Sequence, residues 1–185
     1  HLLGGNAGLL AESALQAIDL GAPGIDLNFG CPAPTVNRHD GGATLLKYPE
    51  RIEEIVGAVR SRVPSQFSVS AKLRLGWDCK KAIFENAKRA ENGGASWITV
   101  HARTKMQGYA PPADWEILRD GVGSAKIPVI VNGDLWEVED LHRAKFLTGA
   151  HAFMLGRGAV ADPYLSHRIR SADLRLIDWE SVLKR

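Results

Sequence analysis

The chain has 185 residues, and its 23 Lys and Arg residues against 21 Asp and Glu residues give a formal net charge of +2 at pH 7. Hydrophobic residues make up 45% of the chain and charged residues 24%, an ordinary globular composition that excludes disordered, collagen-like and coiled-coil proteins. The length fits a single domain. The near-neutral charge gives no global signature of a nucleic-acid-binding protein, so any such surface must be a local patch.

Three features bear on cellular location. No apolar run approaches the roughly 20 residues that a membrane-spanning helix needs. The first residues, His-Leu-Leu-Gly-Gly, carry neither the basic segment nor the cleavage site of a secretory signal. With only two cysteines, Cys31 and Cys79, a disulfide framework is not expected. We therefore predict a cytoplasmic protein without a membrane partner. Because the chain begins with His1 and opens within a pattern, we also expect a fragment.

Apolar periodicity and the positions of Gly and Pro predict alternating helices and strands. The predicted helices cover residues 7–20, 49–63, 79–92, 115–121 and 138–148, and the predicted strands cover 24–28, 67–75, 96–101, 127–132 and 152–156. The second helix has the clearest amphipathic stripe, formed by Ile52, Ile55, Val56, Val59 and Val63. The tail over 163–185 is polar and helix-like, with Trp179 and Val182 as candidate anchors.

Repeated strand–helix units indicate an α/β protein with a parallel sheet, because parallel strands need long crossover connections. Two architectures stay open, a doubly wound open sheet and a (β/α)8 barrel. An intact barrel normally needs about 250 residues and eight strands, so length alone favours the open sheet. The predicted strands, with a stub at Leu2 and Leu3, amount to about six of the eight βα units of a barrel.

Polar residues follow the predicted strands where each strand ends. In parallel α/β folds these carboxyl ends form the ligand-binding face. Lys72 and Arg74 share one face of their strand, and two inward cations would be costly without an anionic partner, for which a phosphate is the natural choice. The residues concerned are Asn28 and Cys31, Lys72 and Arg74, His101 and Arg103, Asn132 and Asp134, and Gly156 and Arg157.

Two glycine turns support an anion site. In Gly156-Arg157-Gly158-Ala159, glycine lets backbone N–H groups approach an anion and Arg157 can add a bidentate contact. Asn132-Gly133-Asp134 is a similar turn after the preceding strand. Together they match the phosphate-binding loops of flavin-dependent and other barrels, and this motif content favours the barrel. The open sheet also lacks a G-x-G-x-x-G motif after its first strand.

Several blocks together resemble one known family. Asp-Leu-Asn-Phe-Gly-Cys-Pro at 26–32 resembles the signature of the tRNA-dihydrouridine synthases, and later blocks agree in order and spacing up to about residue 165. The likeness is greatest to the bacterial C subfamily. The later blocks are Ala-Lys-Leu-Arg-Leu-Gly-Trp at 71–77, Val-His-Ala-Arg-Thr at 100–104, Gln-Gly-Tyr at 107–109, Val-Asn-Gly-Asp at 131–134 and Met-Leu-Gly-Arg-Gly at 154–158.

This resemblance implies a partial TIM (β/α)8 barrel that binds FMN over 1–162, and the start of a helical tRNA-binding domain over 163–185. It implies reduction of the C5–C6 bond of a D-loop uridine in tRNA, with NADPH as reductant and Cys31 protonating C5. Thiols are mostly protonated at neutral pH, which suits a proton donor. The positions implied for the flavin are Lys72, His101, Asn132, Gly133, Asp134, Gly156 and Arg157, and those near the substrate are Asn28, Arg74 and Arg103.

Against the family's pattern, we expect the first two barrel strands and most of the helical domain to be missing, with His1 where the family usually has a flavin-binding Gln. Such a barrel would have two open edges, so we expect oligomerisation or strand exchange between copies. An FMN barrel acting on a free pyrimidine, like dihydroorotate dehydrogenase, and an inactive RNA-binding fragment remain as alternatives.

Plainer interpretations stay open for single residues. Cys31 and His101 could be structural, and Asp134 could cap the following helix. Arg38, Lys47, Arg103 and Lys105 could form a basic rim for RNA, although ordinary solvated charge is an equal interpretation. We find no sequence motif for a metal site.

Overall fold

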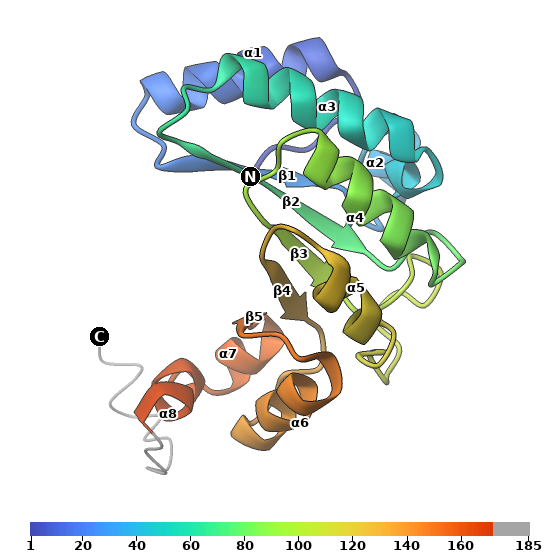
Figure 1. The fold of residues 1–185 in the computed structure, drawn as a ribbon, viewed down its shortest axis with the longest axis vertical. Helices are drawn as coiled ribbons and strands as arrows, with labels where there is room; N and C mark the ends of the chain where they lie inside the picture. Colours follow the sequence, from blue (N-terminus) through green and yellow to red (C-terminus); the bar gives the residue numbers. More distant parts are fainter. Residues whose placement is uncertain (172–185) are drawn as a thin grey trace.

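The computed structural model describes residues 1–171, apart from the side chains of 122, 123 and 171 (Figure 1). Its centre is a parallel sheet in the order β1-β2-β3-β4-β5. The order of the strands in the sheet follows their order in the chain. A doubly wound sheet has a point at which the strand order reverses, and this sheet has no such point. The chain therefore forms part of a (β/α)8 barrel. The strands are β1 (Gly24–Asn28), β2 (Ser68–Arg74), β3 (Ile98–His101), β4 (Val129–Asn132) and β5 (Ala152–Met154).

The sheet is open over the residues that the structure describes, with β1 and β5 as its outer strands. The predicted stub before β1 is present as a single parallel bridge between Leu2 and Leu27. At the carboxyl ends of the strands, the register aligns Asn28 with Lys72, Arg74 with His101, and His101 with Asn132. The predicted site residues thus meet at one edge of the sheet.

The longer helices cover the sheet, and α1 packs against α3, which in turn packs against α4 (Figure 1). The predicted stripe of α3 is confirmed, because Ile52, Ile55, Val56 and Val59 are all buried. Pro49 opens this helix, where its missing N–H costs nothing. The longer helices are α1 (Ala7–Asp19), α3 (Pro49–Arg62), α4 (Ala82–Asn92), α5 (Leu118–Ser124) and α6 (Val138–Thr148).

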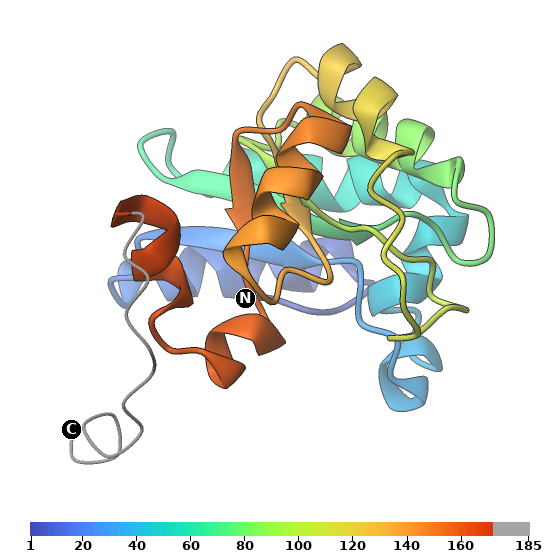
Figure 2. The same ribbon diagram turned by 90° about the horizontal axis from the view of Figure 1, so that it is seen from below.

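Three short helical elements lie in loops where no element was predicted. They are α2 (Pro34–Asn37), the 3-10 helix η1 (Gly42–Lys47) and α7 (Arg157–Ala161). The helix α8 (Leu165–Ser171) lies within the predicted helical tail, while Trp179 and Val182 lie outside the described residues. Both α7 and α8 lie away from α3 and α4 in the two views (Figure 1 and Figure 2).

Two predicted helices begin later in the chain than expected, for tertiary reasons. The segment before α4 is a turn because the backbone at Gly76 packs so closely on the Cys79 carbonyl that a Cβ would overlap it. The segment before α5 is held out of the helix by Trp115, whose indole Nε1 donates to the Gly133 carbonyl over 2.9 Å. None of the helices within residues 1–171 is long and apolar enough to cross a membrane.

Candidate functional site

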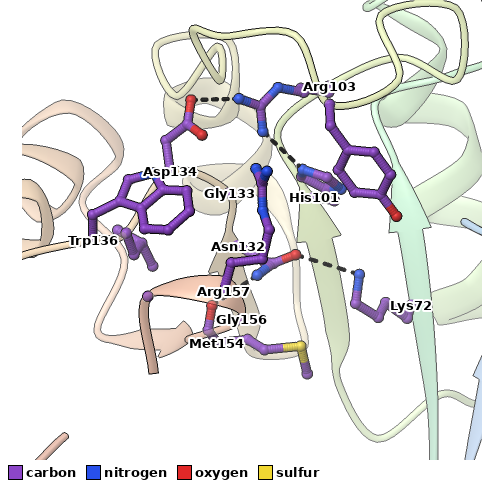
Figure 3. A pocket seen from close by; sticks show the side chains of 13 residues that line it. Lys72, His101, Arg103, Asn132, Gly133, Asp134, Trp136, Met154, Gly156 and Arg157 are labelled. Carbon is purple, nitrogen blue, oxygen red and sulfur yellow. Dashed lines mark hydrogen bonds and ion pairs between the residues drawn. The ribbon is translucent and has the colours of Figure 1, made fainter. Parts of the chain in front are cut away.

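A cavity opens at the carboxyl ends of β2 to β5 (Figure 3). Its volume is about 190 Å³, below the range of about 300–1,000 Å³ typical of small-molecule sites. The structure brings together every position that the resemblance implied for the flavin. The lining residues are Lys72, His101, Arg103, Tyr109, Asn132, Gly133, Asp134, Leu135, Trp136, Met154, Gly156, Arg157 and Gly158.

Arg103 is fully buried and joins three parts of the site. Its Nη2 donates to Asp134 Oδ2 over 2.5 Å, and its Nη1 lies 3.1 Å from His101 Nε2 (Figure 3). Its Nε donates to the Ala110 carbonyl over 2.7 Å. The suggestion that Arg103 belongs to an exposed basic rim is therefore wrong, since its charge is buried and paired with Asp134.

His101 is neutral at physiological pH because its pKa falls from 6.5 to about 3. Burial is the main cause, and the positive charges of Arg74, Lys72 and Arg103 outweigh the opposing charge of Asp134. A guanidinium group has only donors, so His101 Nε2 must accept from Arg103 and the ring proton must lie on Nδ1. The site therefore holds an uncharged imidazole in a defined tautomer.

The turn at Gly133 and Asp134 places the Asp134 carboxylate within hydrogen-bond distance of Arg103. Both residues have positive φ values, +116° and +50°, and a Cβ at Gly133 would lie 3.0 Å from His101 Cδ2. Asp134 Oδ2 also accepts from the Ala113 N–H over 2.7 Å. Burial would raise the Asp134 pKa, but the hydrogen bonds from Arg103 and Ala113 hold it below its usual value.

The alternative interpretation of Asp134 as the cap of the next helix is wrong, because α6 has a capping box that uses other residues. Its N-cap residue is Glu137, whose side chain accepts from the backbone of the third helical residue, while the Asp140 side chain accepts from the Glu137 backbone. The Asp134 carboxylate is thus left to the site.

Lys72 points into the cavity, and no carboxylate of the described residues pairs with its ammonium group. Its Nζ lies 3.4 Å from Asn132 Oδ1, and Asn132 Nδ2 donates to the Met154 carbonyl over 2.8 Å, which orients the amide (Figure 3). Burial, and secondly the charge of Arg74, lower the Lys72 pKa, while Asp26 opposes the shift. Within residues 1–171, Lys72 has no ion-pair partner.

Arg74 does not need the anionic partner that we expected for both cations. It is 2% exposed, and carbonyl oxygens satisfy its guanidinium: Nε donates to Gly30 over 2.8 Å, and Nη1 donates to Thr104 and Gly108 over 3.0 and 2.7 Å. Burial is the main cause of its lowered pKa. Arg74 therefore ties the loop after β1 to the loop after β3.

Arg157 is the first residue of α7, and its exposed side chain lines the cavity. Its guanidinium carbon lies 5.3 Å from the ring centre of Tyr109 and 5.0 Å from that of Trp136. The described part of the chain gives it no ion-pair partner. The next residue, Gly158, packs so closely that a Cβ would overlap the Leu135 carbonyl oxygen, and this contact joins the loops after β4 and β5.

Sequence reasoning did not single out Tyr109 and Trp136, although both line the cavity and hold Arg157. Tyr109 belongs to a block that matched the family, and this was the available signal. Trp136 is 40% exposed, and an exposed large aromatic residue just after a predicted site turn was the second signal.

Cys31 and Asn28 lie at the same edge but do not line the cavity. Asn28 Oδ1 accepts from the Gly30 N–H over 2.9 Å and so shapes the turn that carries Cys31. The thiol is free and half-buried, and the carbonyl of the preceding residue, Gly30, accepts from Arg74 Nε over 2.8 Å. Gly42 packs against it, since a Cβ there would lie 3.0 Å from Cys31 Cβ. Cys31 and the cationic cavity thus share one edge, with Arg74 between them.

Consecutive parallel strands with a cationic cavity at their carboxyl ends define part of a TIM-barrel protein. Among residues 1–171 no group of three or more His, Cys, Asp or Glu side chains could hold a metal ion. The family model for dihydrouridine synthase matches residues 1–181, so the chain belongs to the dihydrouridine synthase family.

The chain is similar to bacterial relatives and to a solved barrel structure. It is 50% identical over 170 residues to the tRNA-dihydrouridine(16) synthase of Neisseria meningitidis serogroup A, covering 92% of this chain and 51% of that protein. It is 49% identical over 172 residues to the protein of that name from Pseudomonas syringae pv. tomato, covering 93% and 54%. The chain thus spans about half the length of these relatives. A 2-naphthoyl-CoA reductase structure has a TM-score of 0.69 at 15% identity, covering 90% of this chain and 29% of that one, and shows the fold alone.

Proposed function

We propose that the protein acts as a tRNA-dihydrouridine synthase, which reduces the C5–C6 bond of a D-loop uridine in tRNA with FMN as cofactor and NADPH as reductant. The names of its relatives support this reaction. The observation that carries the proposal is the shared edge: a free thiol at Cys31 and a cationic cavity around Lys72 and Arg157, joined through the buried Arg74. The activity is proposed for the whole protein, of which the chain matches about half.

The charge of the cavity lining suits an anionic cofactor. Among its lining residues only Asp134 is acidic, and Arg103 already pairs with that carboxylate. Lys72 and Arg157 have no such partner among the described residues, so the cavity carries uncompensated positive charge. We assign Arg157 and the glycine turns at Gly133 and Gly156 to phosphate contacts, because glycine lets the backbone come close to an anion.

The remaining cofactor positions supply polar contacts of defined direction. Lys72 and Asn132 present a cation and an oriented amide, while neutral His101 presents an N–H donor from Nδ1. Asp134 acts indirectly, by holding Arg103 against the imidazole. When bound, FMN supplies the hydride that reduces the base.

Cys31 is the proposed proton donor to C5. Cysteine thiols in general are mostly protonated near pH 7, which suits a proton donor. Reduction at C6 builds negative charge toward the uracil carbonyls, which buried cations at this edge stabilise. Asn28, Arg74 and Arg103 serve the substrate by shaping the loops that surround it, as their hydrogen bonds to Gly30, Gly108 and Ala110 support.

In domain terms, we propose that residues 1–162 hold the flavin and that 163–185 begin a helical tRNA-binding domain. The structure describes this second segment up to residue 171, including α8.

The role of Cys31 is tested by comparing Cys31→Ala with Cys79→Ala, since both cysteines are free. The purified variants are incubated with FMN, NADPH and tRNA that lacks dihydrouridine. Cys31→Ala should nearly abolish dihydrouridine formation while bound flavin stays at the wild-type level, and Cys79→Ala should keep wild-type turnover. Wild-type turnover in Cys31→Ala would remove the thiol from the mechanism.

A further inference from the structure

Two lysines converge on one tryptophan beside the candidate site. The Nζ atom of Lys47 lies 3.8 Å from the ring centre of Trp77, and the Nζ atom of Lys105 lies 4.1 Å from the same centre. Both distances are within the range in which a cation is attracted to an aromatic face. We call these three residues the lysine–tryptophan cluster.

The backbone around the cluster is fixed by contacts between loops. Lys47 ends η1, Trp77 follows β2, and Lys105 follows β3. The Lys105 N–H donates to the Gly76 carbonyl over 2.8 Å, and the Met106 N–H donates to the Trp77 carbonyl over 2.9 Å. The cluster is therefore held in place by the fold.

The cluster lies at the same edge as Cys31. The start of η1 packs on Cys31 through Gly42, and Arg74 binds both the Gly30 carbonyl beside Cys31 and the Thr104 carbonyl beside Lys105. A polymer whose base reaches Cys31 would therefore have its backbone close to these lysines.

The positive charge of the cluster is not neutralised. Neither Lys47 nor Lys105 has an ion-pair partner within residues 1–171. Asp78 follows Trp77 in the chain, but no ion pair joins it to either lysine, and Asp40 pairs with Arg51. The two ammonium groups beside the Trp77 ring form a local cationic surface on a chain whose net charge is only +2.

We propose that Lys47 and Lys105, positioned by Trp77, bind the sugar–phosphate backbone of the substrate RNA next to the reacting uridine. This assignment rests on the proposed function, because the substrate there is an RNA. The Trp77 ring is already engaged by two ammonium groups, so the cluster offers cations to phosphates rather than a free ring face to a base. Phosphate contacts of this kind position a nucleic acid and carry no sequence information. Ordering the lysines on the ring beforehand lowers the entropy lost on binding.

The test measures the affinity of the purified protein for unmodified tRNA at several salt concentrations. The logarithm of the association constant falls as the logarithm of the salt concentration rises, and each phosphate contact adds about 0.7–0.9 to the magnitude of this negative slope. Lys47→Gln/Lys105→Gln should therefore reduce the magnitude of the slope by about 1.4–1.8 and weaken binding at low salt by roughly tenfold. Lys47→Arg/Lys105→Arg keeps both charges, and arginine also stacks on aromatic rings. This variant should keep the wild-type slope.

The matched control is Arg62→Gln/Lys126→Gln, which removes two exposed charges from the end of α3 and from the segment before β4, away from the carboxyl edge. It should leave the slope and the affinity unchanged. An unchanged slope in Lys47→Gln/Lys105→Gln would overturn the proposal, as would an equal loss in the control. A lowered thermal midpoint with an unchanged slope would make the cluster purely structural. If polyglutamate displaced tRNA at equal charge concentration, the surface would instead fit an acidic protein.

Dihydrouridine formation is measured in the same preparations so that the two proposals fail separately. If the wild type binds tRNA with the cluster-dependent slope but forms no dihydrouridine, the proposed function fails and the RNA contact stands. If it forms dihydrouridine and the glutamine variant keeps the wild-type slope, the RNA contact fails and the function stands.

Discussion

Arg103 Nη1 lies 3.1 Å from His101 Nε2, deep in the wall of the cavity, and this contact determines the state of the imidazole. The guanidinium cannot accept a hydrogen bond, so the histidine must be unprotonated at Nε2. Asp134 accepts a hydrogen bond from Nη2 of Arg103 and so holds the guanidinium in place beside the neutral His101. The site therefore gains a neutral donor next to two other cations, Lys72 and Arg74.

The depressed pKa of His101 predicts a pH-dependent stability. In the unfolded chain the imidazole takes up a proton as the pH falls below 6.5, whereas in the folded protein it does so only near pH 3. The folded state should therefore lose about 1.4 kcal/mol per pH unit as the pH falls through this window, and be unaffected above it.

Urea unfolding between pH 6.5 and 5 measures this effect. In that window Asp134 stays ionised in the folded state, because its pKa is lowered, so it contributes little to the slope. His101→Asn keeps an acceptor for Arg103 and removes the titration, and its stability should fall less steeply with decreasing pH. Parallel curves for the two proteins would contradict a buried neutral His101.

The buried pair of Arg103 and Asp134 predicts strong energetic coupling. Arg103→Met leaves the carboxylate without its main partner and should cost about 3–5 kcal/mol of unfolding free energy. Adding Asp134→Asn removes the orphaned charge, so the double variant should lose clearly less than the sum of the single losses. A double-mutant cycle from urea unfolding gives the coupling energy.

The surface pair of Lys80 and Asp114, with 2.7 Å between Nζ and Oδ2, is the matched comparison. Its Lys80→Met variant should cost less than about 1 kcal/mol, because exposed ion pairs contribute little. Additive losses for Arg103 and Asp134 would mean that the buried pair does not act as a unit.

Gly158 predicts a steric limit at the base of the cavity. A Cβ there would overlap the Leu135 carbonyl oxygen, so Gly158→Ala must separate the loops after β4 and β5 and should cost about 1–3 kcal/mol. Gly57 lies within α3, where a Cβ would come no closer than 4.0 Å to the Gly93 carbonyl oxygen. Gly57→Ala should instead stabilise the protein by about 0.5–1 kcal/mol. Thermal unfolding measures the stability of both variants. The same change in stability for Gly158→Ala and Gly57→Ala would contradict the close packing at Gly158.

The open sheet predicts self-association of the 185-residue chain. Over the described residues β1 and β5 are outer strands, and β1 is shielded only by the single bridge to Leu2. Unpaired strand edges favour pairing with another copy. Light scattering should show dimers or larger species that grow with concentration, and a monodisperse monomer at high concentration would contradict the prediction.

The parts of the fold that depend on local pattern were predictable from the sequence. The stripe of α3 and the polar residues after each strand follow from periodicity, and they located the carboxyl edge correctly. The starts of α4 and α5 were not predictable, because the backbone packing at Gly76 and the hydrogen bond from Trp115 join distant segments.

The same limit applied to the charges of the site. Counting cations predicted an anionic partner for Arg74, but its partners are carbonyl oxygens of loops whose course depends on the tertiary fold. The family resemblance implies a place near the substrate for Arg103, but it does not reveal that the side chain is buried, because its burial depends on the turn at Asp134 and the carbonyl of Ala110.

The most direct test of the account compares two substrates in one assay. The purified protein, supplied with FMN and NADPH, is given either unmodified tRNA or free uracil, uridine and orotate, and the products are identified by mass spectrometry. The account predicts dihydrouridine in the tRNA and no reduction of the free pyrimidines. Reduction of the free pyrimidines with unaltered tRNA would contradict it.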